Sequence, residues 1–135
     1  MNVRDFLNSI YLGDRGCKKI IINPWESELE IVIDLISRVR SEDGEWNFYT
    51  DEDIEDGSIV FGDVNLIKYN SKFGGLPNSY INKINLESEN DGVFEFVISI
   101  DSINEELTSS EVLIVVYAKR IFLRNPIYPG VEIHE

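Results

Sequence analysis

Six segments rich in apolar residues follow one another along this chain, and most of the connections between them are no longer than a hairpin needs. Each segment has the alternation, or the unbroken apolar run, that is typical of a β-strand. Almost no room is left for the crossover helices that parallel strands require. The spacing therefore predicts a mainly β fold, an antiparallel six-stranded sandwich or flattened barrel. The segments are 18–23, 28–40, 58–70, 80–87, 93–101 and 111–123.

The clearest strands are the last three. Asp91-Gly92 favours a tight hairpin turn because its residues tolerate positive φ, and residues 112–116 contain no polar side chain, which predicts a central strand covered on both faces. In 28–40 the alternation places Val32 and Ile36 on the face opposite the main apolar one. The predicted core face of 93–101 consists of Phe94, Phe96, Ile98 and Ile100.

The two ends of the chain differ from this β core, which covers about 18–124. The i, i+3, i+4, i+7 spacing of apolar residues predicts a short helix over about 3–12, with Asn2 as its N-cap and Gly13 as its stop. Two prolines predict that 125–135 is an irregular tail. With 135 residues the chain is expected to form a single domain, 1–135.

The charge balance is unusual, with 25 acidic against 12 basic residues and a net charge of -13. A nucleic acid would be repelled and a basic protein attracted, although acidity can also serve solubility alone. No stretch reaches the roughly 20 apolar residues of a membrane span, and the N-terminus lacks a secretory apolar region. Cys17 is the only cysteine, which excludes an internal disulfide. We therefore expect a cytoplasmic protein that binds neither nucleic acid nor membrane.

Catalytic and cofactor motifs are sparse. His134 is the only histidine and lies in the tail, so no nucleophile–histidine pair is evident. Asp51-x-Asp53-x-Glu55 resembles the start of a calcium loop, but the glycine and the final bidentate carboxylate are missing at their positions. Residues 50–57 instead have the pattern of one helical turn. The sequence predicts no enzyme, no metal site and no cofactor.

Residues 41–57 carry eight acids and no lysine or arginine, and three aromatic residues lie among them. Aromatic anchors surrounded by charge are typical of protein interfaces. The alternative is that Trp46 and Phe48 are core residues of a strand and the acids only coat a loop. Trp25, at a hairpin turn, likewise projects outward or folds back over the core. The candidate partner-binding residues are Glu42, Asp43, Glu45, Trp46, Tyr49, Asp51, Glu52, Asp53, Glu55 and Asp56.

Three stretches, 11–18, 37–40 and 46–57, resemble a family of small uncharacterised bacterial proteins, and the resemblance covers most of the chain. The chain is also similar in type to the immunity proteins of polymorphic or contact-dependent toxin systems, which are compact, acidic and without an enzyme motif. This resemblance implies a protein that is a monomer when free and a heterodimer with its toxin.

Three functional hypotheses follow. The first is an immunity protein that neutralises a basic toxin domain, such as a nuclease, through residues 41–57. The second is a small-ligand carrier with a cavity inside a β-barrel. The third is an assembly subunit that uses an apolar sheet face such as Val32 and Ile36. The basic residues near two strand ends are expected to pair with surface carboxylates; they are Lys18, Lys19, Lys119, Arg120 and Arg124.

Overall fold

The computed structural model describes residues 1–135 and contains one helix and twelve strands, all paired antiparallel. The prediction of a mainly β, sandwich-like fold is confirmed; the sheets do not close into a barrel. The elements are α1 (Val3–Asn8), β1 (Ile10–Tyr11), β2 (Cys17–Asn23), β3 (Glu28–Ile33), β4 (Leu35–Arg40), β5 (Phe48–Tyr49), β6 (Ile54–Glu55), β7 (Ser58–Gly62), β8 (Leu66–Ser71), β9 (Ile81–Asn90), β10 (Val93–Ile103), β11 (Ser109–Ala118) and β12 (Arg120–Arg124).

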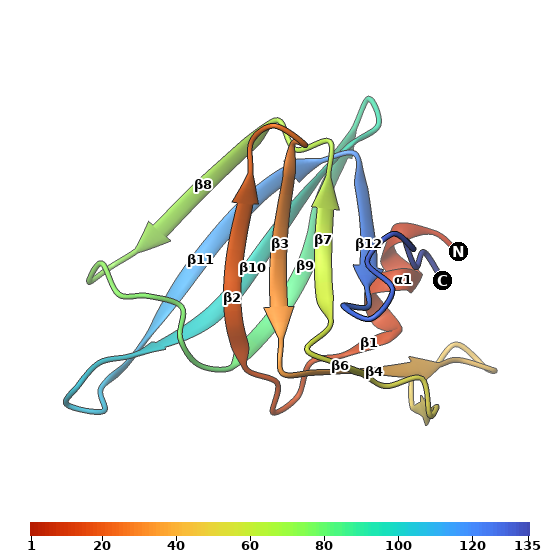
Figure 1. Cartoon of the computed structure of the whole chain (residues 1–135), viewed down its shortest axis with the longest axis horizontal. Helices are drawn as coiled ribbons and strands as arrows, with labels where there is room; N and C mark the ends of the chain where they lie inside the picture. Colours follow the sequence, from red (N-terminus) through yellow and green to blue (C-terminus); the bar gives the residue numbers. More distant parts are fainter.

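Two four-stranded sheets form the sandwich (Figure 1). One has the order β12-β7-β3-β2, and the other, β8-β11-β10-β9, crosses behind it. Apolar residues on alternate positions of both sheets meet in one core, where the rings of Phe61 and Phe96 make an edge-on contact at 5.0 Å between centroids. Phe96, Ile98 and Ile100 are wholly buried, as the alternation predicts.

The predicted strands 58–70 and 111–123 are each two strands. β7 leads into β8, and β11 leads into β12, so that each pair passes from one sheet to the other. Both bends lie at one corner, where the N–H of Lys119 donates to the carbonyl of Gly62 at 3.1 Å and Asp63 has a φ of 51°. A sandwich turns such corners by bending continuous strands. β11 is central, as predicted, with β8 and β10 on its two sides, but only one of its faces is fully covered, since Leu113 and Val115 are half-buried.

The predicted strand 28–40 is also divided, at Asp34. Its carboxylate accepts the N–H groups of Gly16 at 3.1 Å and Leu35 at 2.8 Å, and the chain leaves the sandwich there. β3 stays in the first sheet, whereas β4 forms a small separate sheet with β1, β5 and β6. The break turns Ile36 into the core, where it is wholly buried, and Val32 is half-buried. Ile36 therefore does not share an outer face with Val32, although the alternation suggested that it would.

Both ends of the chain differ from the prediction: the N-terminal helix is shorter, and the C-terminal tail packs against the body of the protein. The Asn2 cap is confirmed, but α1 ends at Asn8 rather than near residue 12, because Ile10 pairs with Arg38 in the small sheet. The tail 125–135 is irregular yet returns to the body, where Ile133 forms a bridge with Leu123. No helix is long and apolar enough to cross a bilayer.

Both predicted hairpins are present. β9 and β10 are joined by Asp91-Gly92, with φ values of 53° and 77°, the pair of left-handed residues that a two-residue turn requires. β2 and β3 are joined by a turn from which Trp25 projects outward, 93% exposed, so it does not cover the core.

Candidate functional site

We call residues 41–57 the acidic segment. It follows β4 at the edge of the molecule and lies outside the two sandwich sheets, at the lower right of Figure 1. β4 pairs with both β5 and β6, which lie within the segment. Further backbone bonds join Thr50 N–H to the carbonyl of Arg38 at 3.1 Å and Asp56 N–H to the carbonyl of Asp34 at 3.1 Å. The segment is thus held along one strand and presents its other side to solvent.

The tip of the acidic segment is shaped by its own short hydrogen bonds. Gly44 has a φ of 92°, and its N–H donates to the hydroxyl of Ser41 at 2.8 Å. The carboxylate of Asp43 accepts the N–H of Glu45 at 3.1 Å. Such side-chain bonds to nearby amides stabilise turns without any contact to the body.

The aromatic residues of the segment are not core residues. Phe48 is 55% and Tyr49 is 62% exposed, while Trp46 is half-buried, so the alternative that places Trp46 and Phe48 in the core is wrong. The ring of Tyr49 makes an edge-on contact with Tyr11 at 5.5 Å, and the guanidinium of Arg15 lies 5.1 Å from the Tyr11 ring centroid. β1 and β5 together therefore display aromatic rings to solvent.

The helical turn expected at 50–57 is also absent. Residues 54–55 pair with β4 as β6, and Ile54 is buried in the main core. The hydroxyl of Thr50 does accept the N–H of Glu52 at 3.2 Å, but no helix follows. Pairing with β4 buries Ile54, which an isolated surface turn would leave exposed.

Only two of the eight acids in the segment are neutralised by a neighbouring base. Glu52 pairs with Arg40 at 2.8 Å, and Asp56 pairs with Lys18 at 2.6 Å. The hydrogen bond from Arg40 lowers the pKa of Glu52, and the bond to Asp56 raises the pKa of Lys18. The six acids that form no ion pair are Glu42, Asp43, Glu45, Asp51, Asp53 and Glu55.

A buried cation lies beneath the segment. Arg38 is 1% exposed and forms no ion pair; its guanidinium donates to the hydroxyl of Ser9 at 2.8 Å and to the Ser9 carbonyl at 3.4 Å. The ring of Phe6 lies 5.6 Å from it. Burial lowers the pKa of Arg38, Arg40 lowers it further, and Glu52 opposes this shift. Glu52 therefore also stabilises a charge that β4 carries into the interior.

Sequence reasoning singled out the acids of this surface and missed its supporting residues Tyr11, Arg15, Arg38 and Arg40. A signal for the two arginines exists, because Arg38 and Arg40 directly precede a segment that contains no base of its own. Tyr11 and Arg15 lie far away in sequence, and only the pairing of β1 with β4 brings them to the site.

The expected pairing of the other bases is confirmed in part. Arg120 contacts Asp63 at 3.0 Å and Glu132 at 2.7 Å, and Arg124 contacts both Glu28 and Glu30 at 3.3 Å. In contrast, Lys19 and Lys119 form no ion pair.

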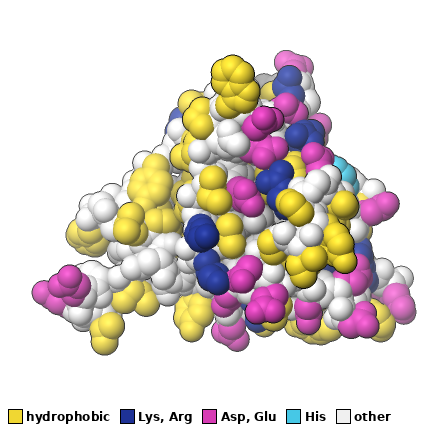
Figure 2. Space-filling model, viewed as in Figure 1, with side chains coloured by type: hydrophobic (Ala, Val, Ile, Leu, Met, Phe, Trp, Pro, Cys, Tyr) yellow, Lys and Arg dark blue, Asp and Glu magenta, His cyan; other side chains and the backbone are white.

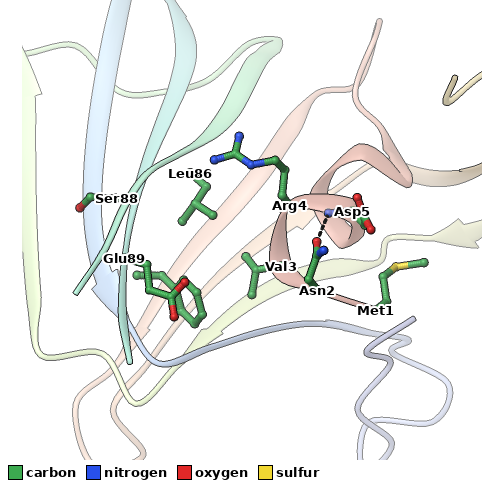
Figure 3. A pocket seen from close by; sticks show the side chains of 9 residues that line it. Met1, Asn2, Val3, Arg4, Asp5, Leu86, Ser88 and Glu89 are labelled. Carbon is green, nitrogen blue, oxygen red and sulfur yellow. Dashed lines mark hydrogen bonds between the residues drawn. The ribbon is translucent and has the colours of Figure 1, made fainter. Parts of the chain in front are cut away.

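The rest of the surface has hollows but no cluster of metal-ligating side chains. No group of three or more His, Cys, Asp or Glu side chains is placed to hold a metal ion. A hollow of about 560 Å³ lies between α1 and β9 (Figure 3). The dashed line there marks the N–H of Asp5 donating to the Asn2 side chain at 2.8 Å, so this amide of the helix start is already occupied. The lining mixes Arg4 with Asp5 and Glu89 and has no convergent set of donors.

Comparison with known proteins adds the family. A model described as a family of unknown function (DUF6258) matches residues 1–135. The chain belongs to this family. The expectation of an uncharacterised family that covers most of the chain is thereby confirmed, and DUF6258 carries no stated activity, ligand or partner. A search of curated proteins and a search of solved structures each found no match.

Proposed function

We propose that this member of DUF6258 binds a basic protein domain through its acidic segment. The observation that carries the proposal is the combination, on one supported edge of the molecule, of exposed rings at Phe48 and Tyr49 with six carboxylates that no base neutralises. A surface that served solubility alone would have no reason to expose aromatic rings within it.

The two kinds of side chain would have different tasks in a complex. The rings supply apolar area that is buried on binding, and such aromatic anchors carry most of the energy of an interface. The unpaired carboxylates attract a cationic partner and orient it during approach, which raises the association rate more than the final affinity. Association is therefore expected to slow as salt is added.

The finer proposal is that the partner is a bacterial toxin domain and that the chain is its immunity protein. The similarity in type, one compact acidic domain whose sequence has no enzyme motif, supports this choice. A nuclease toxin fits best, because its substrate groove must be basic and would accept the acidic segment as a competitor of the phosphate backbone. Binding there would block the groove, and the free chain would be a monomer that forms a heterodimer with the toxin.

The test uses the intact chain and the C-terminal domain encoded directly upstream in the same genome. Coexpression should restore growth, and calorimetry at two salt concentrations should show tight binding that salt weakens. The test variant neutralises the six unpaired acids of the segment, and the control neutralises six exposed acids elsewhere: Glu26, Glu87, Glu89, Asp91, Glu105 and Glu106.

Both variants change the net charge equally, from -13 to -7, since six of the acidic charges are removed in each. A specific surface predicts that only the first variant loses binding. Equal losses would show that net charge alone acts, and unchanged binding by both would place the interface elsewhere. No binding by the unaltered chain would refute the toxin proposal.

A further inference from the structure

A second surface lies on the opposite side of the sandwich, where the two sheets diverge between β2 and β8; we call it the β2–β8 cleft (Figure 1). Its upper end is closed by the N–H of Val64 donating to the Ser27 carbonyl at 2.9 Å. Its lower end is closed by the N–H of Cys17 donating to the Ser79 carbonyl at 3.0 Å. Two hollows, of about 550 Å³ and 210 Å³, occupy the cleft, and Ile22 lines both.

The cleft exposes side chains that belong to the inner faces of the sandwich. Ile20 and Ile22 pair with the core residues Ile31 and Leu29 and so lie on the same face of the sheet as they do, while Tyr69 of β8 pairs with the core residue Ile114. Even so, Ile22 is 57% and Tyr69 is 52% exposed. Figure 2 shows hydrophobic side chains gathered over β8 at the left of the view. These apolar groups lack the covering that their counterparts on the central strands have.

The backbone of β2 is also open along the cleft. In an antiparallel sheet, successive residues direct their N–H and C=O groups to opposite neighbours. Ile33 donates its N–H to Gly57, towards β7, so Glu30 of the same strand bonds in the other direction, to its partner Ile21. The N–H and C=O groups of Ile20 and Ile22 therefore point away from β3, into the open edge.

Part of this edge is protected and part is not. A bulge between Cys17 and Lys19, with Lys18 beside it, blocks the lower end in the way that natural edge strands resist unwanted pairing. The upper end, Ile20 to Asn23, has neither bulge nor lysine. The unprotected part of β2 can therefore form backbone hydrogen bonds with an added strand, whereas the bulge at the lower end limits how far that strand can extend.

The larger hollow of the cleft is basic, whereas the chain as a whole is acidic; Glu28, the one carboxylate that lines the smaller hollow, is paired with Arg124. The larger hollow is lined by Lys18 and Lys19 and by no carboxylate, although the chain carries a net charge of -13. Lys18 is paired with Asp56, whereas Lys19 has no ion pair. β2 itself contains no acidic residue, so a second copy that paired through the same edge would bring no β2 carboxylate to Lys19. Complementarity therefore favours an acidic occupant over a second copy.

We propose that the β2–β8 cleft binds an extended segment of another protein, with alternating apolar and acidic residues, as a fifth strand added to β2. Strand addition satisfies the free groups of Ile20 and Ile22, places apolar side chains against the exposed inner faces, and brings a carboxylate to Lys19. The unprotected part of β2, Ile20 to Asn23, offers roughly 13 Å of edge at about 3.3 Å per residue. A small molecule fits less well, because the cleft is open along its length and binding sites for small ligands enclose most of the ligand.

The probe is a displayed library of random nine-residue peptides selected on the full chain. The selected peptides should alternate apolar and acidic residues, and the best of them should slow hydrogen exchange of the amides of Ile20 and Ile22. Neutralising the six unpaired acids of the acidic segment should not weaken this binding, so the result is independent of the proposed function. If no sequence is enriched, if lysine-rich peptides are, or if binding leaves both amides unprotected, the proposal is overturned.

Two substitutions of one residue separate backbone pairing from apolar contact. Ile22→Pro removes the N–H that points away from β3, a position at which an edge strand tolerates proline. Ile22→Ala keeps that N–H and shortens the side chain. The proline variant should bind the selected peptide at least about tenfold more weakly than the alanine variant. Proline removes the hydrogen bond from the N–H of residue 22 to the peptide and disturbs the neighbouring backbone bonds along this edge. Equal affinities would refute strand addition. If Ile22→Pro does not fold, protection of the Ile20 and Ile22 amides by the bound peptide still tests strand addition, and Lys19→Glu should weaken binding of the acidic peptide; unprotected amides or unchanged binding would overturn the proposal.

Discussion

Replacing Ser9 with alanine removes the only side-chain acceptor of the buried Arg38 guanidinium. This contact matters for the acidic segment because Arg38 lies in β4, which carries the segment. The Ser9 hydroxyl also donates to the carbonyl of Phe6 at 2.6 Å, at the end of α1. The substitution thus disturbs the junction between the helix, β4 and the segment above it.

The expected destabilisation follows from these two bonds. A buried charged donor that loses its acceptor costs about 1–3 kcal/mol, and a neutral hydrogen bond contributes about 1 kcal/mol net. The Ser9 carbonyl stays within 3.4 Å of Arg38, which keeps the first value near its lower limit. Ser9→Ala should therefore lower the free energy of unfolding by about 2 kcal/mol.

Removing the charge itself should be less harmful than leaving it unsatisfied. Arg38→Met keeps an unbranched, largely apolar side chain and removes the cost of burying an unpaired charge, so its net effect should be small. With methionine at position 38, Ser9→Ala loses only the bond to Phe6 and should cost about 1 kcal/mol. The coupling energy between the two sites is then about 1 kcal/mol.

Urea unfolding of the four proteins of this double-mutant cycle measures the coupling. Ser109→Ala serves as the control, since Ser109 is exposed and should change stability by less than about 0.5 kcal/mol. If Ser9→Ala costs the same in both backgrounds, or if Arg38→Met is the more damaging single change, the buried guanidinium does not depend on Ser9 and the reasoning fails.

Gly57→Ala should destabilise the protein by about 1–3 kcal/mol, because a Cβ there would lie 2.8 Å from Ile54 Cγ2. Thermal unfolding measures this effect, with Gly130→Ala as the control, since a Cβ at Gly130 would lie in open space. Equal melting temperatures of the two variants would contradict the packing argument. Arg40 holds the pKa of Glu52 below its ordinary value of 4.5, so the stability that this pair contributes is present above pH 4.5 and is lost as the pH falls through the lower folded value. Glu52→Gln should therefore lose less stability than the unaltered chain between pH 5 and pH 3, as measured by urea midpoints; parallel curves would count against the pair. Burial raises the pKa of the Cys17 thiol from 9.0 to about 11, so iodoacetamide at about pH 8 should alkylate the native chain far more slowly than the chain unfolded in urea, and similar rates would show that the thiol is not shielded.

Much of the fold was predictable because its signals are local. Alternation in residues 93–101 reflects one buried and one less buried face, and Asp91-Gly92 specifies its turn through the positive φ that both residues adopt. Asn2 caps α1 through a bond that spans three residues. Each of these features depends on neighbours within a few positions along the chain.

The candidate site was predictable only as a composition. The acids of residues 41–57 are evident in the sequence, but Tyr11 and Arg15 reach the site through β1, whose pairing with β4 overrides the continuation of the helix. The partners Lys18 and Arg40, which neutralise two of the acids, likewise depend on where distant strands are placed. Composition shows which charges are present, and the fold determines which of them stay unpaired.

The sequence by itself determined that this chain is antiparallel, mainly β and strongly acidic, because side-chain alternation, turn residues and charge are local properties. Only the tertiary structure decided that three long apolar runs bend at Asp34, Asp63 and Lys119 into different sheets, since alternation shows which face is apolar but not which element covers it. For the same reason only the structure reveals that Ile22 and Phe48 are exposed.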